Sequence, residues 1–297
     1  MTDTQDPNNN PVTVAPADHQ TGLNEHAALS DEATIFAEGL VKRFDQLVAV
    51  DNISIDVRAG EFFGFLGPNG AGKSTTIRML TGLLRPTAGR VRIAGFDLFA
   101  QPIEVKRRIG VLPEELNLYE RLSAEEFLDF SGKMHGIDRN EVARRTADLL
   151  DLMELTESKD KLIVDYSMGM KKKVALAAAL IHAPKVLFLD EPFSGVDAIS
   201  TRAILGILHH LMERGTTVFF SSHVLEMVER LCTRVAIIHK GRIVGLGTMD
   251  DLRAQARARD GAQDPDHVPG PGDSSLEDVF LTLVEARAET DALSWIT

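Results

Sequence analysis

Short apolar runs alternate with amphipathic stretches along most of the chain. From about residue 35 onward, runs rich in Val, Ile, Leu and Phe precede stretches whose apolar residues recur every three or four positions. Examples are EFFGFL before KSTTIRMLTGLL, and KVLFLD before AISTRAILGILHHLMERG. The first pattern is typical of buried strands and the second of helices. Their alternation predicts an α/β fold in which helices cover both faces of a parallel sheet.

The alternation is interrupted between about residues 115 and 165. The segments AEEFLDFSGKMHG and EVARRTADLLDLMEL have helical periodicity, and no clear strand separates them. We therefore expect an inserted helical subdomain at this place. Strands and helices then resume, and RVAIIHKGRIVGLG predicts a hairpin that turns at Lys240 and Gly241.

The C-terminal part begins with a change in composition. Residues 263–273, QDPDHVPGPGD, are typical of a linker because Pro and Gly interrupt regular structure. Ser274 and Glu277 follow as a possible capping box. One helical face then carries five apolar residues, which predicts a docked terminal helix: Leu276, Val279, Phe280, Leu283 and Val284.

Charge is distributed unevenly over the 297 residues. The net charge is −12, but residues 1–33 contribute −6 and residues 248–297 contribute −7, so that the middle carries +1. The first segment is also rich in Asn, Pro and Thr without hydrophobic periodicity, which favours a disordered acidic leader. We therefore divide the chain into a leader (1–33), a main domain (34–247) and a C-terminal extension (248–297).

The sequence argues against a disulfide-bonded, a membrane-spanning and a nucleic-acid-binding protein. An apolar fraction of 44% is ordinary for a globular chain, and Cys232 alone cannot form an intrachain disulfide, so we expect a small buried side chain there. The first residues do not resemble a signal peptide, and the longest apolar run, near Val174 to Ile181, is shorter than a membrane span of about 18 residues. The acidic balance argues against a nucleic-acid partner.

A phosphate-binding loop follows the apolar run EFFGFL. Residues 67–75 read GPNGAGKST, and a predicted helix begins within them. Glycine lets backbone N–H groups turn toward a phosphate, and the helix N-terminus adds a favourable dipole. Lys73 is expected to contact the β and γ phosphates, and Ser74 to coordinate Mg²⁺. The spacing and context predict a nucleotide site formed by these residues: Gly67, Pro68, Asn69, Gly70, Ala71, Gly72, Lys73, Ser74 and Thr75.

A pair of acids ends another apolar strand. Asp190 follows Val186 to Leu189, where a carboxylate is costly unless a cation or hydrogen bonds compensate it. Mg²⁺ is a natural partner for Asp190. Side chains alternate along a strand, so Glu191 points elsewhere, toward the expected position of an attacking water. In isolation the pair could be a simple acidic strand end, but the phosphate loop favours the catalytic interpretation.

Five motifs in this order resemble the nucleotide-binding subunits of ATP-binding-cassette transporters. The further motifs are residues 166–170 (YSMGM), 194–197 (SGVD) and 221–223 (SSH), and the resemblance covers about residues 34–247. It implies a P-loop NTPase fold with a RecA-like core, an antiparallel β subdomain at the start and the inserted helical subdomain.

The resemblance also implies roles for single residues. Phe44 would stack on adenine, although a core aromatic is the alternative. Ser167 and Gly169 would reach the γ-phosphate bound by a second copy, and Asp197 would lie at the interface between the copies. His223 would contact the γ-phosphate and orient Glu191, whereas outside this family it would be interpreted as a cap or core residue.

Three positions depart from the usual family pattern. Glu114 stands where glutamine is usual, so an additional carboxylate lies near the phosphates and Mg²⁺. The signature reads YSMGM in place of the common LSGGQ, and Ala198 replaces a frequent proline. The YS-x-GM form and the PEE segment resemble exporters of drugs, lipids or polysaccharides. Lys171, Lys172 and Lys173 are interpreted as one solvated turn of a helix.

The implied function is ATP hydrolysis that powers export. Two copies would form a head-to-tail dimer around two ATP and Mg²⁺ units, with Glu191, His223 and Lys73 catalytic and Ser74, Asp190 and Glu114 near the metal. A polytopic membrane subunit would hold the chain at the cytoplasmic face of the membrane. The alternatives are a soluble cassette ATPase acting on ribosomes or DNA, and a noncatalytic regulatory cassette; the single cassette and the retained catalytic residues disfavour them.

Overall fold

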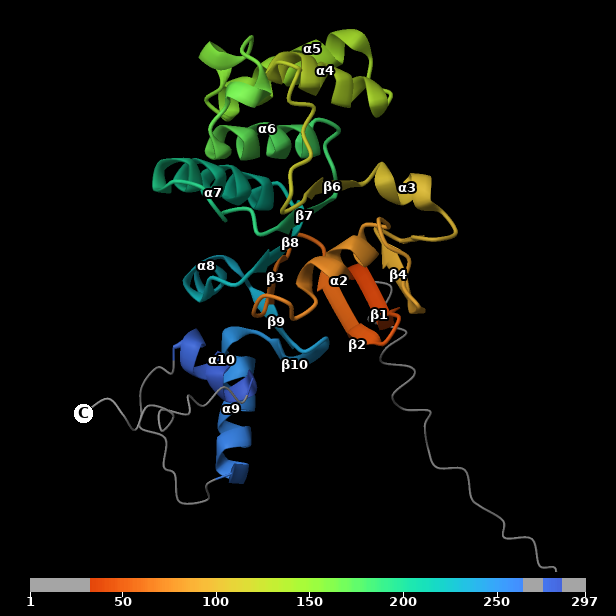
Figure 1. The fold of residues 1–297 in the computed structure, drawn as a ribbon, viewed down its shortest axis with the longest axis vertical. Coiled ribbons are helices and arrows are strands. Elements are labelled where there is room, and N and C mark those ends of the chain that lie inside the picture. The colour runs from red at the N-terminus through yellow and green to blue at the C-terminus, as the bar shows by residue number, and fades with distance from the viewer. Residues whose placement is uncertain (1–32, 264–274, 285–297) are drawn as a thin grey trace, which may run out of the picture.

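The structure, a computed structural model, describes residues 33–263 and 275–284. The predicted leader and linker lie outside these residues, apart from Ala33 and Gln263. Figure 1 shows a central sheet between helices, with α4 and α5 at one end of the molecule and α9 and α10 at the other. Among the described helices, none has both the length and the apolar character needed to cross a membrane.

The central sheet has six strands in the order β10-β9-β3-β8-β7-β6. β3, β6, β7, β8 and β9 run parallel, and β10 pairs antiparallel with β9 across the predicted hairpin. The strands are β3 (Phe62–Leu66), β6 (Ile109–Leu112), β7 (Val186–Asp190), β8 (Thr217–Ser222), β9 (Arg234–His239) and β10 (Arg242–Gly247). The parallel α/β prediction is confirmed.

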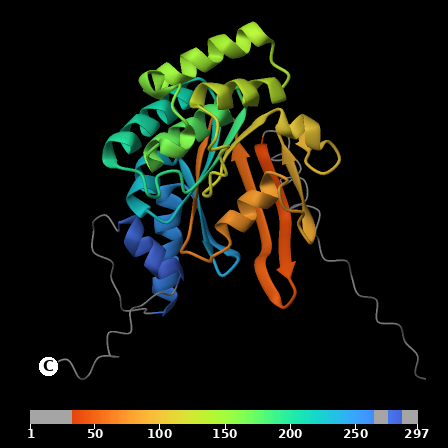
Figure 2. The ribbon, with the colours of Figure 1, turned by 45° about the horizontal axis from the view of Figure 1, so that its top comes forward.

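A second, antiparallel sheet of four strands has the order β2-β1-β4-β5. Its members are β1 (Ala33–Phe44), β2 (Leu47–Arg58), β4 (Ala88–Ile93) and β5 (Phe96–Asp97). This sheet is the expected antiparallel β subdomain; its first two strands stand at the start of the main domain, and it lies beside α2 (Figure 2).

Helices and short 3₁₀ turns occupy the remaining described segments. α4 and α5 stand in the place predicted for the helical subdomain and pack on α6 (Figure 1). The helices are α2 (Lys73–Leu80), α3 (Pro102–Lys106), α4 (Ala124–Met134), α5 (Arg139–Leu152), α6 (Met168–Leu180), α7 (Ala198–Glu213), α8 (Leu225–Leu231), α9 (Met249–Gln263) and α10 (Leu276–Val284), with η1 (Thr156–Ser158) and η2 (Ile163–Asp165).

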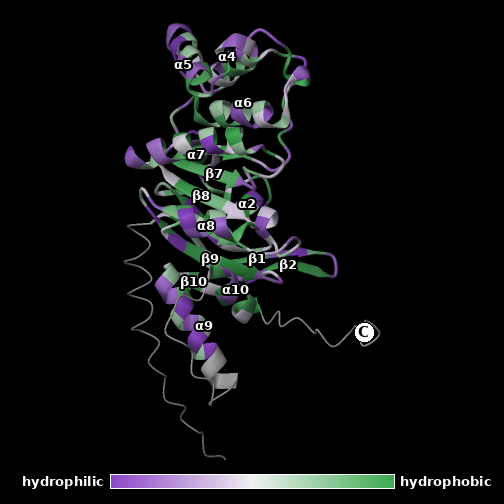
Figure 3. Cartoon of the chain, turned by 90° about the vertical axis from the view of Figure 1, so that its left-hand side faces the viewer, coloured by the Kyte–Doolittle hydropathy of each residue, from purple (hydrophilic) through white to green (hydrophobic). Residues whose placement is uncertain are grey.

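Alternation along the parallel strands produces two cores, one on each face of the sheet. In β8, Val218 and Phe220 belong to the core under the large helices, whereas Phe219 points to the core shared with α2 and the antiparallel sheet. Phe62 and Phe63 divide in the same way. The strands are apolar on both faces, as is usual for buried parallel sheets (Figure 3).

The C-terminal helix α10 docks on α8, α9 and β10. Four residues of its predicted apolar face are buried, and Phe280 packs against them with partial exposure: Leu276, Val279, Leu283 and Val284. The predicted cap is wrong by one position. Ser275 and Asp278 form the reciprocal hydrogen bonds, because the helix begins at Leu276 and Asp278 is its third residue. Ser274 lies outside the described residues.

The prediction of a solvated lysine turn is also wrong. Lys172 and Lys173 on α6 are only 2% and 6% exposed. Lys171 pairs with Glu120 and Lys173 with Glu154, whereas Lys172 donates a hydrogen bond to a backbone carbonyl. The three neighbours differ because successive helical residues point about 100° apart and α6 is packed on most of its sides.

Candidate functional site

The phosphate loop connects β3 to α2 in the predicted strand-loop-helix order. Two of its glycines are required by space and conformation. A Cβ on Gly67 would lie 2.5 Å from the carbonyl oxygen of Ile238, and a Cβ on Gly72 would lie 2.7 Å from that of Ala49. Gly72 also has φ +109°, a conformation that disfavours other residues. The loop therefore wraps closely around the first turn of α2.

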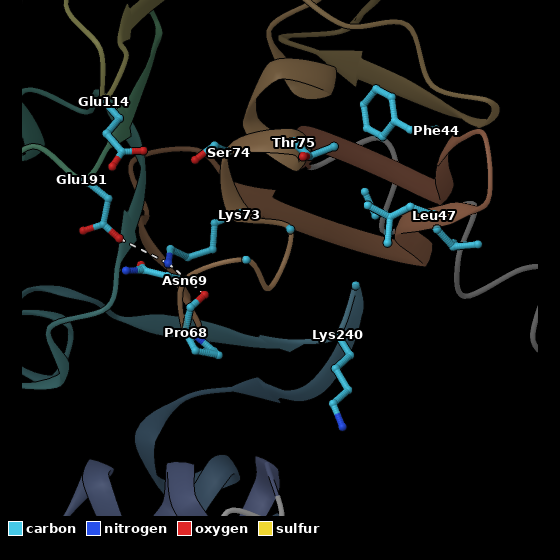
Figure 4. A pocket seen from close by; sticks show the side chains of 15 residues that line it. Phe44, Leu47, Pro68, Asn69, Lys73, Ser74, Thr75, Glu114, Glu191 and Lys240 are labelled. Atoms are coloured by element: carbon cyan, nitrogen blue, oxygen red, sulfur yellow. Dashed lines mark hydrogen bonds and ion pairs between the residues drawn. The ribbon is translucent and has the colours of Figure 1, made fainter.

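A cavity of about 640 Å³ opens beside this loop (Figure 4). Predicted residues from four separate regions of the chain meet in its wall: Phe44, Pro68, Asn69, Gly70, Gly72, Lys73, Ser74, Thr75, Glu114 and Glu191. Gly67 and Ala71 belong to the same loop but do not line the cavity. The cavity is large enough for a small organic ligand, and its cradle fits a phosphate chain.

Lys73 lies buried at the base of the cavity. Its Nζ donates to the carbonyl oxygens of Gly67 and Pro68 at 2.7 and 3.3 Å and lies 3.3 Å from Glu191 Oε1. Lys73 is 6% exposed, so these contacts compensate a charge that would otherwise be costly to bury. An anionic phosphate at this place would compete with Glu191 for the same ammonium.

Asp190 and Glu191 are organised by β8. Ser221 Oγ donates to Asp190 Oδ1 at 2.6 Å and accepts from the Glu191 backbone N–H at 3.1 Å. Glu191 Oε2 lies 2.9 Å from His223 Nδ1. Its other oxygen, Oε1, is buried and has no hydrogen-bond partner, although Lys73 is close. Glu191 thus connects the lysine to the histidine.

The oxygen donors near the loop fit a magnesium ion. Ser74 and Glu114 line the cavity, and Asp190 precedes the lining residue Glu191 without lining the cavity itself. The three supply hydroxyl and carboxylate oxygens, which Mg²⁺ prefers, and the unsatisfied Glu191 Oε1 suits a bound water. No group of three or more His, Cys, Asp or Glu in residues 33–263 and 275–284 could hold a metal alone. This agrees with the usual coordination of Mg²⁺, which combines one or two protein ligands with several waters and the phosphates of the substrate.

Phe44 lies at the outer end of the cavity, far from Glu191 (Figure 4). Its side chain is 44% exposed, and the Lys42 ammonium lies 4.9 Å from the ring centroid. The alternative of a core aromatic does not fit this exposure. A ring held at the rim with one accessible face can stack on a planar base.

Ser167, Gly169 and Asp197 form a second group, which does not line the cavity of the same chain. Ser167 caps α6 by accepting from the Met170 N–H at 3.3 Å. Asp197 caps α7 and accepts from the N–H groups of Ser200 and Ile199, which lower its pKa. The helix ends at Ser167 and Asp197 lie side by side, since Gly169 faces Asp197 and Ser200.

We expect Gly169→Ala to destabilise the protein, because its Cβ would lie 2.6 Å from Ser200 Oγ and 3.0 Å from Ser200 Cβ. Overpacking of this kind costs about 1–3 kcal/mol. Gly206→Ala is the matched control: Gly206 also lies within a helix, and its Cβ would meet nothing within 4 Å. It should stabilise by about 0.5–1 kcal/mol. Urea unfolding measures both, and equal stabilisation by the two variants would contradict the close packing.

Sequence reasoning missed several residues of the site. Leu47, Val48, Ala49, Lys240 and Gly241 also line the cavity, because the β1–β2 and β9–β10 turns reach its rim. In the sequence, the only available signal was that the apolar residues Leu47 and Val48 stand close to Phe44. The structure shows that both side chains are exposed. The side chain of Lys240 points away from the loop (Figure 4). No local pattern indicated the hydroxyl bridge at Ser221.

Comparisons with known proteins identify the family of the chain. The family model described as ABC transporter matches residues 50–194. The linearmycin resistance ATP-binding protein LnrL of Bacillus subtilis is 41% identical over 216 residues, which are 73% of this chain and 70% of LnrL. The daunorubicin/doxorubicin resistance ATP-binding protein DrrA of Streptomyces peucetius is 39% identical over 220 residues, 74% of this chain and 67% of DrrA.

A solved structure of an ATP binding subunit of an ABC transporter has the same fold. It matches with a TM-score of 0.75 and 30% identity, covering 84% of this chain and 99% of its own. The α/β fold and these relatives point to the same family. The chain therefore belongs to the ABC transporter family, as one of its ATP-binding subunits.

Proposed function

We propose that this chain hydrolyses ATP to drive the export of drug-like compounds through a separate membrane subunit. The observation that carries the proposal is the meeting of Lys73, Glu191 and His223 at the phosphate loop, with Lys73 and His223 on different oxygens of one buried carboxylate. A noncatalytic cassette would not need this arrangement. The names of the relatives LnrL and DrrA, both resistance proteins, support the substrate class.

ATP would bind along the cavity from Phe44 to Glu191. Adenine stacks on Phe44, and the triphosphate enters the loop, where Lys73 exchanges its contact with Glu191 for the β and γ phosphates. Ser74, Asp190 and Glu114 would hold Mg²⁺, which when bound neutralises charge on the phosphate oxygens. The exchange frees the Glu191 carboxylate to accept a hydrogen bond from water.

Hydrolysis then needs a base and charge stabilisation. The oxygen of a water molecule attacks the γ-phosphorus, the bond from phosphorus to the β-γ bridging oxygen breaks, and ADP leaves with that electron pair. Glu191 accepts the proton of the water. His223, 2.9 Å from Glu191 Oε2, orients this carboxylate, and Lys73 stabilises charge on the transferring group.

A second copy completes the site in this proposal. Ser167 and Gly169 of each copy would face the γ-phosphate held by the other in a head-to-tail dimer. The proposal is supported by two exposed apolar side chains beside this group, Met168 at 51% and Ile199 at 81%, which a partner surface would cover.

The membrane subunit would dock between the core and the helical subdomain. An apolar groove of about 450 Å³ lies there. Its aromatic side chains and several of its long aliphatic ones come from α4 and the segment before it: Leu116, Leu118, Tyr119, Phe127, Phe130 and Met134. A polytopic partner seated on this groove would hold the chain at the cytoplasmic face of the membrane. Two of its lining residues, Pro113 and Leu116, flank Glu114 in the sequence, so docking can affect the ATP site.

Lys73→Ala tests the function. We expect ATP turnover by the purified chain, measured as phosphate release with Mg²⁺, to fall about 10²- to 10³-fold, since a preorganised cation at the transferring group is lost. Lys133→Ala, which removes an exposed lysine paired with Asp129, is the control and should keep normal turnover. Turnover that persists without Lys73 would contradict the proposed site.

A further inference from the structure

Lys172 is a buried lysine for which sequence motifs assign no role. It lies in α6, five residues after the cap Ser167, and is 2% exposed. Its Nζ donates to the backbone carbonyl oxygen of Glu191 at 2.8 Å, and the Ser194 N–H donates to the same oxygen at 3.2 Å. The ammonium therefore contacts the residue that carries the candidate catalytic carboxylate.

Stability alone does not explain a lysine at this place. Removing an ammonium from water costs several kcal/mol, and an apolar side chain of similar volume is often neutral or stabilising. Burial lowers the pKa of Lys172, while the carboxylates of Glu191, Glu114 and Asp190 act in the opposite direction.

Glu191 has an unusual backbone conformation, and hydrogen bonds hold both its N–H group and its carbonyl group. Its φ is +48°, in the left-handed region, which is strained for a residue with a side chain and persists only where its surroundings hold it. Ser221 holds its N–H group, and Lys172 and Ser194 hold its carbonyl. This conformation directs the carboxylate toward Lys73 and His223.

We propose that Lys172 is a positioning residue, which holds the Glu191 backbone in its left-handed conformation. This proposal rests on the proposed function, in which Glu191 is the base. Ser167 caps α6, and Gly169 and Lys172 lie in it. The start of α6 would face the ATP bound by the second copy, whereas Lys172 contacts the glutamate that would act on this chain's own ATP. The helix therefore connects the two ATP sites.

Lys172→Met tests the role, because it keeps the chain length and removes the cation and the donor. We expect kcat for ATP to fall about 10- to 100-fold, as for a misplaced catalytic group, while KM and ATP affinity change less than about two-fold. Lys172→Arg should recover a large part of kcat. Lys171→Met is the matched control, since Lys171 pairs only with Glu120 at the surface, and it should keep normal kcat.

Hydrogen exchange separates positioning from general structure. Exchange in the nucleotide-free Lys172→Met protein should accelerate in residues 190–197 and stay unchanged in β3. A fall in thermal stability with a rise in KM, and no recovery by arginine, would overturn the positioning role.

Comparing Lys172→Met with Glu191→Gln separates the positioning role of Lys172 from the role of Glu191 as the base. An unchanged kcat in Lys172→Met, together with an inactive Glu191→Gln, overturns the role of Lys172 alone. Normal turnover in both variants overturns the assignment of Glu191 as the base, and with it the role proposed for Lys172.

Discussion

Glu191→Gln is expected to lower ATP turnover about 10²- to 10⁴-fold, the range for loss of a general base, while ATP still binds. The amide is nearly isosteric with the carboxylate and can keep a hydrogen bond to His223 Nδ1, but it cannot take a proton from water. Loss of the negative charge next to Lys73 should leave nucleotide affinity equal or higher. Phosphate release at saturating ATP measures the first effect, and equilibrium binding of ATP measures the second.

The matched control for this variant is Glu213→Gln, on the exposed end of α7. The Glu213 side chain is 77% exposed and lies 3.9 Å from His210. It does not line the cavity, and solvent screens its charge from the ATP site. The control should hydrolyse ATP at the normal rate. Equal turnover by wild type, Glu191→Gln and Glu213→Gln would assign the base to another residue.

Phe219→Ala is expected to destabilise the fold by about 3–5 kcal/mol, the usual cost of removing a buried ring. Phe219 lies in the middle of β8 and is fully buried. Its ring centroid lies between 5.4 and 5.6 Å from those of Phe63, Phe65 and Phe188, so that one ring contacts both neighbouring strands. The free energy of unfolding in urea measures the loss.

Phe130→Ala provides the comparison for the core variant. Phe130 is 41% exposed on α4 and meets Tyr119 edge to face. Its loss should cost only about 0.5–1.5 kcal/mol, the value of one aromatic pair. If both variants lost equal stability, the four-ring cluster would not be the main support of the central sheet.

The parts of the molecule that could be predicted are those determined by local pattern. The apolar runs before Gly67 and before Asp190 specify strands, and the glycines with Lys73 specify a turn into a helix. Both follow from the properties of neighbouring residues, and the structure places both as expected. The apolar face of α10 was predicted for the same reason, since its spacing alone identifies which residues become buried.

The features that could not be predicted depend on contacts between distant segments. Lys171, Lys172 and Lys173 have similar sequence surroundings, and only the packing of α6 against β6 and the helical subdomain decides that Lys172 and Lys173 become buried. The φ of +48° at Glu191 likewise depends on Ser221, thirty residues later. The cap was predicted one residue too early, at Ser274 in place of Ser275. Two serines precede α10, and each is followed by an acid three residues later, so the capping-box pattern fits both.

The docking of α10 sets a limit on how the chain can be shortened. A Cβ at Gly245 of β10 would lie 2.8 Å from Leu283 and 3.0 Å from Leu252, so the edge of the central sheet is shaped to receive α9 and α10. A recombinant protein ended after Gly247 would keep every motif of the ATP site and still leave the apolar surfaces of α8 and β10 uncovered. Such a fragment should self-associate, and a soluble minimal ATPase from this chain needs to extend through Val284.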